Sequence, residues 1–317
     1  MAILKATSEA IAAAGAALRN GDLVAFPTET VYGLGADATN ARAVAAIFAA
    51  KGRPRFNPLI VHVSDAPAAT GLGLFNESAR RLAAAFWPGP LTLVVARQHG
   101  CPVADLATAG LDTIALRVPD HAVAKALLEA AGRPIVAPSA NRSGHVSPTT
   151  AEHVEADLGP SVAIILDGGP APLGLESTVI DATGAEPVIL RLGAVPREAV
   201  ARAVGAAVAV SYGEPDRPAS PGMLARHYAP AAGLRLDARD VHEGEALLAF
   251  GADVPKHAGP MLNLSASGDL VEAAANLFAA LRALDRTGAN AIAVMPIPQH
   301  GLGEAINDRL RRAARAP

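Results

Sequence analysis

Residues 26–63 read FPTETVYGLGADATNARAVAAIFAAKGRPRFNPLIVHV, and they combine a hydroxyl-rich loop, a helix, a basic loop and a strand. Apolar side chains recur at helical spacing over residues 41–50, which predicts a helix. Lys51-Gly52 should end it, because Gly commonly follows the last helical residue and Arg53-Pro54 cannot continue a helix. Residues 59–63 are rich in β-branched side chains and predict a strand.

Two loops of this stretch carry groups that bind anions. Lys51, Arg53 and Arg55 lie on the basic loop, and the hydroxyls of Thr28 and Thr30 lie on the loop before the glycines. Together they predict an anion-binding cleft. The alternative is a surface loop with solvated charges, and composition alone leaves both interpretations open.

Composition limits the class of protein. At 317 residues the chain is long enough for about two domains, and 51% hydrophobic residues are ample for their cores. A net charge of −3 gives no global attraction to nucleic acid or membrane. The single Cys101 excludes an intramolecular disulfide and a Cys-rich zinc site, and it fits a reducing compartment. No signal peptide or membrane span is apparent, so we expect a cytoplasmic protein.

Strand and helix patterns alternate along the whole chain, which predicts an α/β fold. Helices are expected at residues 8–20, 77–86, 121–131, 269–285 and 303–315, the first of them capped by Ser8. Further strands are expected at residues 23–26, 91–96, 114–118, 134–137, 164–167, 177–181, 188–192, 234–236, 246–250, 261–264 and 291–295.

Two of these strands contain an arginine among apolar residues. Arg117 lies in residues 114–118 and Arg191 in residues 188–192. A buried cation is costly unless it is paired or faces a wet cleft. Each arginine is therefore either part of a structural ion pair or a ligand clamp, and the repetition favours a shared anionic ligand.

Residues 138–148, PSANRSGHVSP, form a loop of small polar side chains that leave backbone N–H groups accessible. Such a loop suits phosphate oxygens or base edges, and it is equally consistent with a turn before the next helix. Thr149 and Glu152 match a capping box at the start of that helix.

Residues 211–233 break the alternation. Their prolines and glycines indicate an interdomain linker, but Met223, Leu224 and Tyr228 are more than a solvated tether needs. We interpret the segment as a lid that packs onto another part of the protein. The basic helix at residues 303–315 is interpreted as a terminus that complements its own dipole.

Common catalytic signatures are missing from the sequence: there is no HExxH, no GxSxG and no Walker A motif. Hydroxyls and scattered cations on loops instead favour a site that positions anionic reactants and neutralises charge developing at phosphorus. Nucleotidyl or phosphoryl transfer and passive anion binding are both compatible with it.

An ordered set of motifs resembles the YrdC/Sua5 family. The set is PTETVYGLG, KGRPRFNPLIVHV, PGPLTLV, ALRVPDH, APSANRSGHVSPT, ESTVID and ILRLG. Lys51 and Arg53 with Ser139 and Asn141 resemble the family's KxR…SxN signature. The linker motif SPGMLARHYAP and the module after it resemble the longer Sua5 form.

This resemblance implies a YrdC-like domain, three-layered with a twisted mixed sheet, at residues 1–208, a linker or lid at 209–233 and a small Rossmann-like domain at 234–317. It implies synthesis of L-threonylcarbamoyladenylate and pyrophosphate from L-threonine, bicarbonate and ATP, with Mg²⁺. That product serves the t6A37 modification of tRNA by a downstream threonylcarbamoyl transferase machinery, and weak contact with tRNA is possible.

The resemblance also implies site residues. Lys51, Arg53 and Arg117 are the expected catalytic residues. The expected L-threonine ligands are Thr30, His62, Arg117, Ala137 and Ser177. The expected ATP ligands are Lys51, Arg53, Asn57, Thr113, Ser139, Asn141, Ser147, Arg191, His227 and Tyr228. No metal ligands are implied.

Two alternatives stay open at this point. One is a factor that binds RNA or the ribosome through the same basic cleft, although the net charge and the lack of an aromatic platform count against it. The other is a relative that acts in hydrogenase maturation, against which the Sua5-type linker and C-terminal module count.

Overall fold

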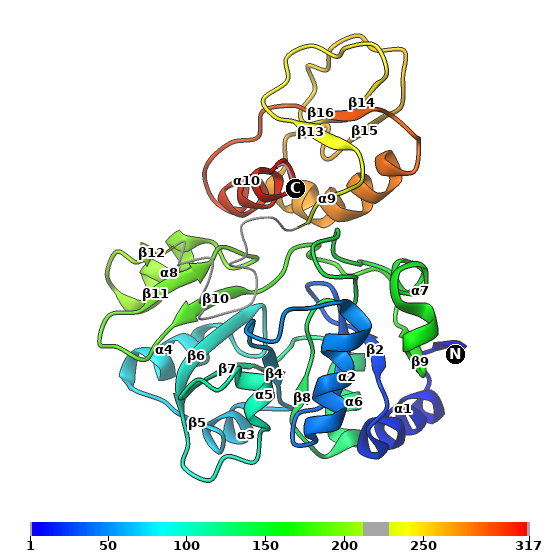
Figure 1. The fold of residues 1–317 in the computed structure, drawn as a ribbon. Helices are drawn as coiled ribbons and strands as arrows, with labels where there is room; N and C mark the ends of the chain where they lie inside the picture. Colours follow the sequence, from blue (N-terminus) through cyan, green and yellow to red (C-terminus); the bar gives the residue numbers. More distant parts are fainter. Residues whose placement is uncertain (1, 212–227, 316–317) are drawn as a thin grey trace.

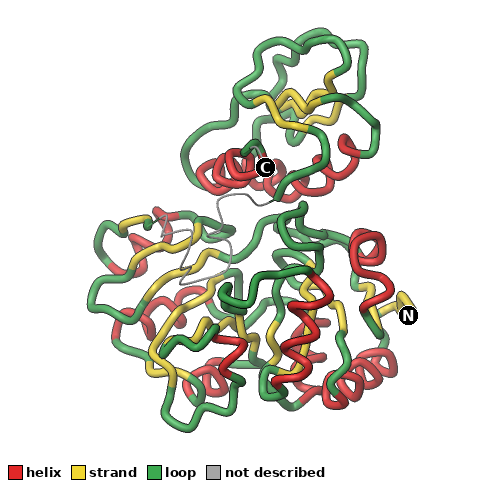
Figure 2. Tube along the Cα trace, in the orientation of Figure 1, coloured by secondary structure: helices red, strands yellow, loops and turns green. Residues whose placement is uncertain are grey.

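Two β-sheets with their helices make up the protein. The structure is a computed structural model, and it describes residues 2–211 and 228–315. Residues 2–211 build an N-terminal domain around the larger sheet, and residues 228–315 build a C-terminal module around the smaller one (Figures 1 and 2). The α/β class predicted from the sequence is confirmed in both.

The N-terminal sheet is mixed, as predicted. Its order is β1-β9-β2-β3-β8-β4-β7-β6-β10-β11-β12, with β5 paired to β6. The pair β4–β7 is parallel, whereas β6–β7 and β2–β3 are antiparallel. Its strands are β1 (Ala2–Lys5), β2 (Val24–Pro27), β3 (Tyr32–Asp37), β4 (Ile60–His62), β5 (Gly73–Leu74), β6 (Leu91–Arg97), β7 (Thr113–Arg117), β8 (Ile135–Val136), β9 (Ile164–Asp167), β10 (Thr178–Asp181), β11 (Val188–Arg191) and β12 (Ala209–Val210).

Helices cover both faces of this sheet, which makes three layers. Val24 and Phe26 of β2 pack in one cluster with helices α1 and α6, whereas Ala25 between them packs in another with α2. This alternation follows from the two-residue period of a strand. The helices of the domain are α1 (Ser8–Asn20), α2 (Ala41–Lys51), α3 (Ala66–Thr70), α4 (Glu77–Phe86), α5 (Asp105–Thr108), α6 (Ala122–Ala131), α7 (Ala151–Leu158), η1 (Gly159–Ser161) and α8 (Arg197–Val204).

Helix α2 begins and ends as the sequence predicts. The Asn40 side chain accepts hydrogen bonds from the N–H groups of Arg42 and Ala43 at its start. Gly52 follows the helix with φ of 61°, a left-handed conformation that favours glycine. Lys51 is thereby the last helical residue, and it is buried rather than solvated.

Two predicted caps are wrong by one residue. Helix α1 is capped by Thr7, whose hydroxyl accepts from Ala10 N–H at 3.2 Å, and not by Ser8. Helix α7 is capped by Thr150, whose hydroxyl accepts from His153 N–H at 3.4 Å, so the capping box predicted at Thr149 is shifted. In each case the cap hydroxyl lies three residues before the N–H that it binds.

Several elements are not predicted from the sequence, among them strand β3 and helix α8. Gly33 and Gly35 lie in strand β3 rather than in a loop, because Phe26 of the neighbouring strand crosses this position: a Cβ on Gly35 would lie 2.9 Å from the Phe26 ring. Helix α8 at Arg197–Val204 is not predicted either, although it is amphipathic and buries Val200.

The C-terminal module has four parallel strands in the order β13-β16-β14-β15. The strands are β13 (Gly233–Arg235), β14 (Glu245–Ala249), β15 (Met261–Asn263) and β16 (Ala291–Val294), and the helices are α9 (Leu270–Asp285) and α10 (Leu302–Ala313). Both helices lie on the side of the module that faces the N-terminal domain (Figure 1). Within the described ranges, no helix is both long and apolar enough to cross a membrane.

Candidate active site

A narrow polar cavity lies where several strand ends and loops of the N-terminal domain converge. It collects most of the residues predicted for the site: Thr30, Arg53, His62, Arg117, Ala137, Ser139, Ser177, Arg191 and Tyr228. Val31, Ile60, Pro138 and Glu176 complete its lining. Residues far apart in the sequence thus meet because their strands are neighbours in one sheet.

One side of the cavity carries His62 and Arg117. The parallel register of β4 and β7 places these two residues opposite each other. Burial and the positive charge of Arg117 lower the pKa of His62 to about 3, so its imidazole is neutral at physiological pH. The Thr30 hydroxyl lies 2.8 Å from that of Thr28, which holds it in place.

The sequence left open whether Arg117 belongs to a structural ion pair or faces a ligand site. The structure shows both features, because Arg117 is ion-paired and also lines the cavity. Its Nη2 lies 2.7 Å from Oε1 of Glu29, and both side chains are buried. The pair is close, but neither atom has a well-aligned hydrogen bond among the described residues. Arg117 Nε reaches the carbonyl oxygen of Gly89 at 3.4 Å. The guanidinium therefore retains hydrogen-bonding capacity toward the cavity.

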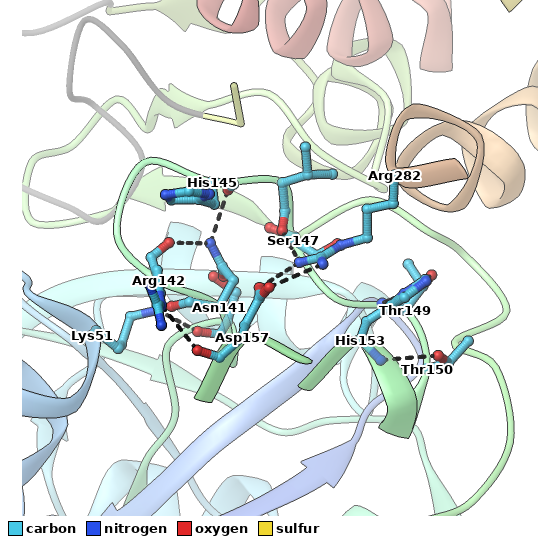
Figure 3. A network of polar contacts seen from close by, with 12 residues as sticks. Lys51, Asn141, Arg142, His145, Ser147, Thr149, Thr150, His153, Asp157 and Arg282 are labelled. Atoms are coloured by element: carbon cyan, nitrogen blue, oxygen red, sulfur yellow. Dashed lines mark hydrogen bonds and ion pairs between the residues drawn. The ribbon is translucent and has the colours of Figure 1, made fainter. Parts of the chain in front are cut away.

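The two halves of the KxR…SxN motif are joined by Lys51. Its Nζ donates to the carbonyl oxygen of Ser139 at 2.5 Å and to that of Asn141 (Figure 3). The Asn141 amide in turn donates to the carbonyls of Arg142 and His145, each at 2.8 Å. Burial, followed by repulsion from Arg53, lowers the pKa of Lys51 well below its ordinary value. A nearby anion would oppose both effects.

Arg53 is a second buried cation beside Lys51. It donates to two main-chain carbonyls, Asn57 O at 3.3 Å and Pro58 O at 3.0 Å. Burial and repulsion from Arg191 lower the pKa of Arg53 to about 10, so it keeps its charge at neutral pH. The Asn57 side chain is 1% exposed, and neither its oxygen nor its nitrogen has a hydrogen-bond partner among the described residues. Such orphaned amides are typical of a site that awaits a ligand.

Arg191 fixes the opposite wall. Its Nη2 donates to the carbonyl oxygen of Ser177 at 2.9 Å and to the Ser177 hydroxyl at 3.1 Å. The same hydroxyl lies 2.8 Å from that of Thr92 on β6. The buried arginine at the end of β11 therefore positions Ser177 at the cavity.

Some predicted residues are not part of the cavity lining. They are Lys51, Asn57, Thr113, Asn141 and Ser147. Ser147 donates to Oε1 of Glu176 at 2.5 Å. Thr113 begins β7, two residues before Ala115, which is paired with Ile60. Pro58, whose carbonyl oxygen accepts a hydrogen bond from Arg53, also lies two residues before Ile60. Because the two strands are parallel, Thr113 lies at the end of β7 that is nearer the basic loop. His227 lies outside the described residues.

Sequence reasoning missed two buried carboxylates of this site. Glu29 and Glu176 lie within the motifs PTET and ESTVID, and only their neighbours Thr30 and Ser177 were selected. Each glutamate lies next to a predicted ligand and compensates a nearby arginine. A search for partners of the predicted buried arginines could have found them.

Two family profiles match successive parts of the chain. A profile of the Sua5–YciO–YrdC family, described as telomere recombination, matches residues 16–193. A second profile, described as threonylcarbamoyl-AMP synthase, C-terminal domain, matches residues 195–315.

Relatives extend over nearly the whole chain. A threonylcarbamoyl-AMP synthase from Pyrococcus abyssi is 44% identical and matches over 94% of this chain and 92% of its own length. The Bacillus subtilis protein of the same name is 41% identical over 96% and 92%. A crystal structure of P. abyssi Sua5 complexed with L-threonine has a TM-score of 0.89, with 40% identity, and covers 97% of this chain and 95% of its own.

Proposed function

Because this chain belongs to the Sua5 branch of the Sua5–YciO–YrdC family, we propose that it is a threonylcarbamoyl-AMP synthase. Its substrates are L-threonine, bicarbonate and ATP, and its products are L-threonylcarbamoyladenylate and pyrophosphate. The roles given below to individual residues are part of the proposal.

One observation carries the assignment of the nucleotide side. Lys51 and Arg53 are both buried, and within the described residues neither has a carboxylate partner within ion-pair distance. Burial of uncompensated cations is costly unless an anion binds to them. The triphosphate of ATP supplies that negative charge, and Lys51 and Arg53 neutralise the charge that develops as the nucleotide reacts.

The remaining nucleotide ligands lie around these two cations. In this proposal Asn57, Ser139, Asn141 and Arg191 bind the phosphates or the nucleoside, and Thr113, Ser147, His227 and Tyr228 complete the pocket. The orphaned amide of Asn57 supports a polar ligand at that point.

In this proposal L-threonine occupies the side of the cavity that carries His62 and Arg117. Arg117 pairs with its carboxylate, because a guanidinium offers two parallel donors to a carboxylate. Thr30, His62, Ala137 and Ser177 surround the rest of the amino acid. His62, whose pKa is lowered to about 3 mainly by burial, acts as a neutral hydrogen-bonding partner and not as a cation.

No nucleophile of the protein is needed. The amine of threonine forms a C–N bond with bicarbonate, and water is lost as the carbamate forms. A carbamate oxygen then attacks the α-phosphorus of ATP, and the bond from that phosphorus to the β-phosphate oxygen breaks to release pyrophosphate. Alignment of the carbamate with the α-phosphate provides most of the catalysis.

Mg²⁺ enters this proposal with ATP. Across residues 2–211 and 228–315, no cluster of His, Cys, Asp or Glu is arranged to hold a metal ion. The nearest carboxylates, Glu29 and Glu176, are engaged by arginines. In this proposal the phosphates of ATP would be ligands of the ion.

A downstream tRNA threonylcarbamoyl transferase would consume the adenylate, which places the enzyme in the cytoplasm beside tRNA modification. Direct contact with tRNA is a weaker part of the same proposal. A narrow cavity of buried groups does not favour RNA as the primary ligand.

The experiment is a reconstituted reaction with ATP, Mg²⁺, bicarbonate and L-threonine, in which pyrophosphate and the adenylate are measured by mass spectrometry. We expect adenylate only when all substrates are present. L-Serine, which lacks the threonine methyl group, tests selectivity in parallel.

Lys125→Ala is the matched control for Lys51→Met, because Lys125 lies on the exposed surface of α6. Both variants are compared at equal folded concentration. If folded wild-type protein binds ATP but forms no adenylate, the proposed function is wrong.

A further inference from the structure

Helix α10 of the C-terminal module carries an arginine that is buried against the N-terminal domain. Arg309 is 0% exposed, so this helix is more than a terminus that complements its own dipole. Its Nε lies 2.9 Å from Oε2 of Glu176, and its Nη2 donates to the carbonyl oxygen of Leu192 at 2.8 Å. Asp308 pairs with its Nη1 at 2.8 Å. The charge of Arg309 is thus balanced from both parts of the protein.

Glu176 connects this arginine to the cavity. One carboxylate oxygen accepts from Arg309, the other accepts from the Ser147 hydroxyl at 2.5 Å, and the side chain lines the cavity. Burial alone would raise the pKa of Glu176, but attraction by Arg309 and Arg191 outweighs burial and lowers it. The carboxylate is therefore ionised and held between two fixed partners.

Tyr228 is the second contact of Arg309 at the cavity. The guanidinium carbon lies 4.9 Å from the centroid of the Tyr228 ring. The same ring stacks on Phe278 of α9, with centroids 5.6 Å apart and an interplanar angle of 22°. Tyr228 is buried and also lines the cavity. Helices α9 and α10 of the C-terminal module thus both contact the ring of Tyr228, a residue of the cavity lining.

A further arginine of the module binds the loop that carries Ser147. Arg282 of α9 pairs with Asp157 at 2.6 Å and donates to the carbonyl oxygens of Val146 and Ser147 (Figure 3). Ser147 is consequently fixed through its main chain by Arg282 and through its side chain by the Glu176–Arg309 pair. The first interaction comes directly from the C-terminal module, and the second is linked to it through Arg309.

We propose that Arg309 is a positioning residue of the active site, supplied by the C-terminal module, which fixes Glu176 and Tyr228 at the nucleotide side of the cavity. This inference rests on the proposed function for the identity of the ligand. Loss of Arg309 would leave Glu176 buried without its ion-pair partner, and the carboxylate would then turn or bind a proton. A turn of the carboxylate releases Ser147, and the loss of the guanidinium uncovers one side of the Tyr228 ring.

A second ion pair between helix α10 and the N-terminal domain serves as the control for the contacts of Arg309. Arg197 of α8 pairs with Glu304 of α10 at 2.7 Å, and the Arg197 side chain is 44% exposed. It joins the same two parts of the protein without lining the cavity. If α10 acted only as an anchor, disruption of either pair would have the same kind of effect.

The test compares Arg309→Met and Arg309→Lys with Arg197→Met in the full-length protein. The readouts are kcat, the KM for ATP, the KM for L-threonine and the thermal midpoint of unfolding. We expect the Arg309 variants to raise the KM for ATP by roughly ten- to a hundredfold. The KM for L-threonine should change less, and Arg197→Met should leave both constants unaltered.

A double variant tests whether Arg309 acts through Glu176. Glu176→Gln combined with Arg309→Met should be no less active than Arg309→Met alone, because both changes break one unit. If Arg309→Met does not fold, two other variants replace it. Arg309→Lys keeps the positive charge, and Glu176→Gln leaves helix α10 unchanged. Wild-type KM values for both substrates in the Arg309 variants, whatever their kcat or thermal midpoint, would overturn the inference.

Failure of the inference is distinguishable from failure of the proposed function. Wild-type protein that forms no adenylate contradicts the function. Active wild-type protein with unaltered ATP affinity in the Arg309 variants, measured also by calorimetric titration of ATP alone, contradicts only the role of Arg309.

Discussion

Lys51 Nζ lies 2.5 Å from the carbonyl oxygen of Ser139, which is 88 residues further along the chain. This hydrogen bond joins the two halves of the KxR…SxN motif at one edge of the cavity. Lys51 therefore both supports the loop that follows β8 and supplies a cation at the nucleotide side. Its removal should affect both.

Lys51→Met should lower kcat/KM for ATP about 100-fold or more, because it removes a buried charge that faces the phosphates. Steady-state kinetics with varied ATP checks this, with Lys125→Ala as the control. A variant that keeps wild-type ATP kinetics would show that Lys51 only supports the loop.

Arg117→Met should abolish saturation by L-threonine within the accessible range, because the carboxylate loses its guanidinium partner. It should also destabilise the protein by about 3–5 kcal/mol, since Glu29 is left buried and unpaired. Denaturant unfolding measures the second effect.

Addition of Glu29→Gln separates the two consequences of losing Arg117. The double variant should recover most of the lost stability, because the neutral amide needs no counter-charge, and it should stay inactive. Recovery of activity in that variant would mean that Arg117 does not bind the substrate.

His62 should make the folding stability depend on pH. Its folded pKa is about 3, lowered mainly by burial, below the ordinary value of 6.5. As the pH falls below about 6.5, the unfolded chain binds a proton that the folded protein does not, so stability decreases until the pH nears 3. Above pH 6.5 the contribution is fully present.

His62→Gln removes this titration, so its loss of stability between pH 7 and 4 should be smaller than that of the wild type. Thermal midpoints over this range check the slope. His153, whose pKa is also lowered, to about 4, is present in both proteins and contributes equally. Parallel curves for the two proteins would contradict the neutral state assigned to His62.

Gly193→Ala should displace the corner that carries Glu176 and Ser177. A Cβ at this position would lie 2.4 Å from the Glu176 carbonyl oxygen and 2.5 Å from the Ser177 carbonyl carbon, and backbone atoms cannot yield as a flexible side chain does. We expect a loss of about 1–3 kcal/mol in stability. Activity should fall by roughly 100-fold.

Gly184→Ala is the matched control, because its added Cβ would meet only the Glu186 carbonyl oxygen at 3.7 Å, an ordinary contact. It should retain wild-type activity and thermal midpoint. Equal behaviour of the two variants would mean that the Glu176–Ser177 corner tolerates displacement.

Local signals predicted much of the fold. Helix α2 ends where Lys51-Gly52 indicates, and the strand at residues 164–167 has the predicted bounds. Strand β3 was not predicted, because Gly33 and Gly35 look like loop residues until Phe26 packs across them. The amphipathic helix α8 was overlooked. The predicted and observed caps of α1 and α7 differ by one residue, because two adjacent residues carry a hydroxyl at each of these helix starts.

The sequence by itself determined the family, through ordered motifs, and it marked Arg117 and Arg191 as cations out of place in apolar strands. Only the tertiary structure decided what balances the charges of Arg117 and Arg309, because their partners Glu29 and Glu176 are distant in the chain. The cost of a buried charge depends on its surroundings in space, and spacing along the chain does not record them. For the same reason, the contribution of Arg309 to the site became visible only once α10 was packed against the N-terminal domain.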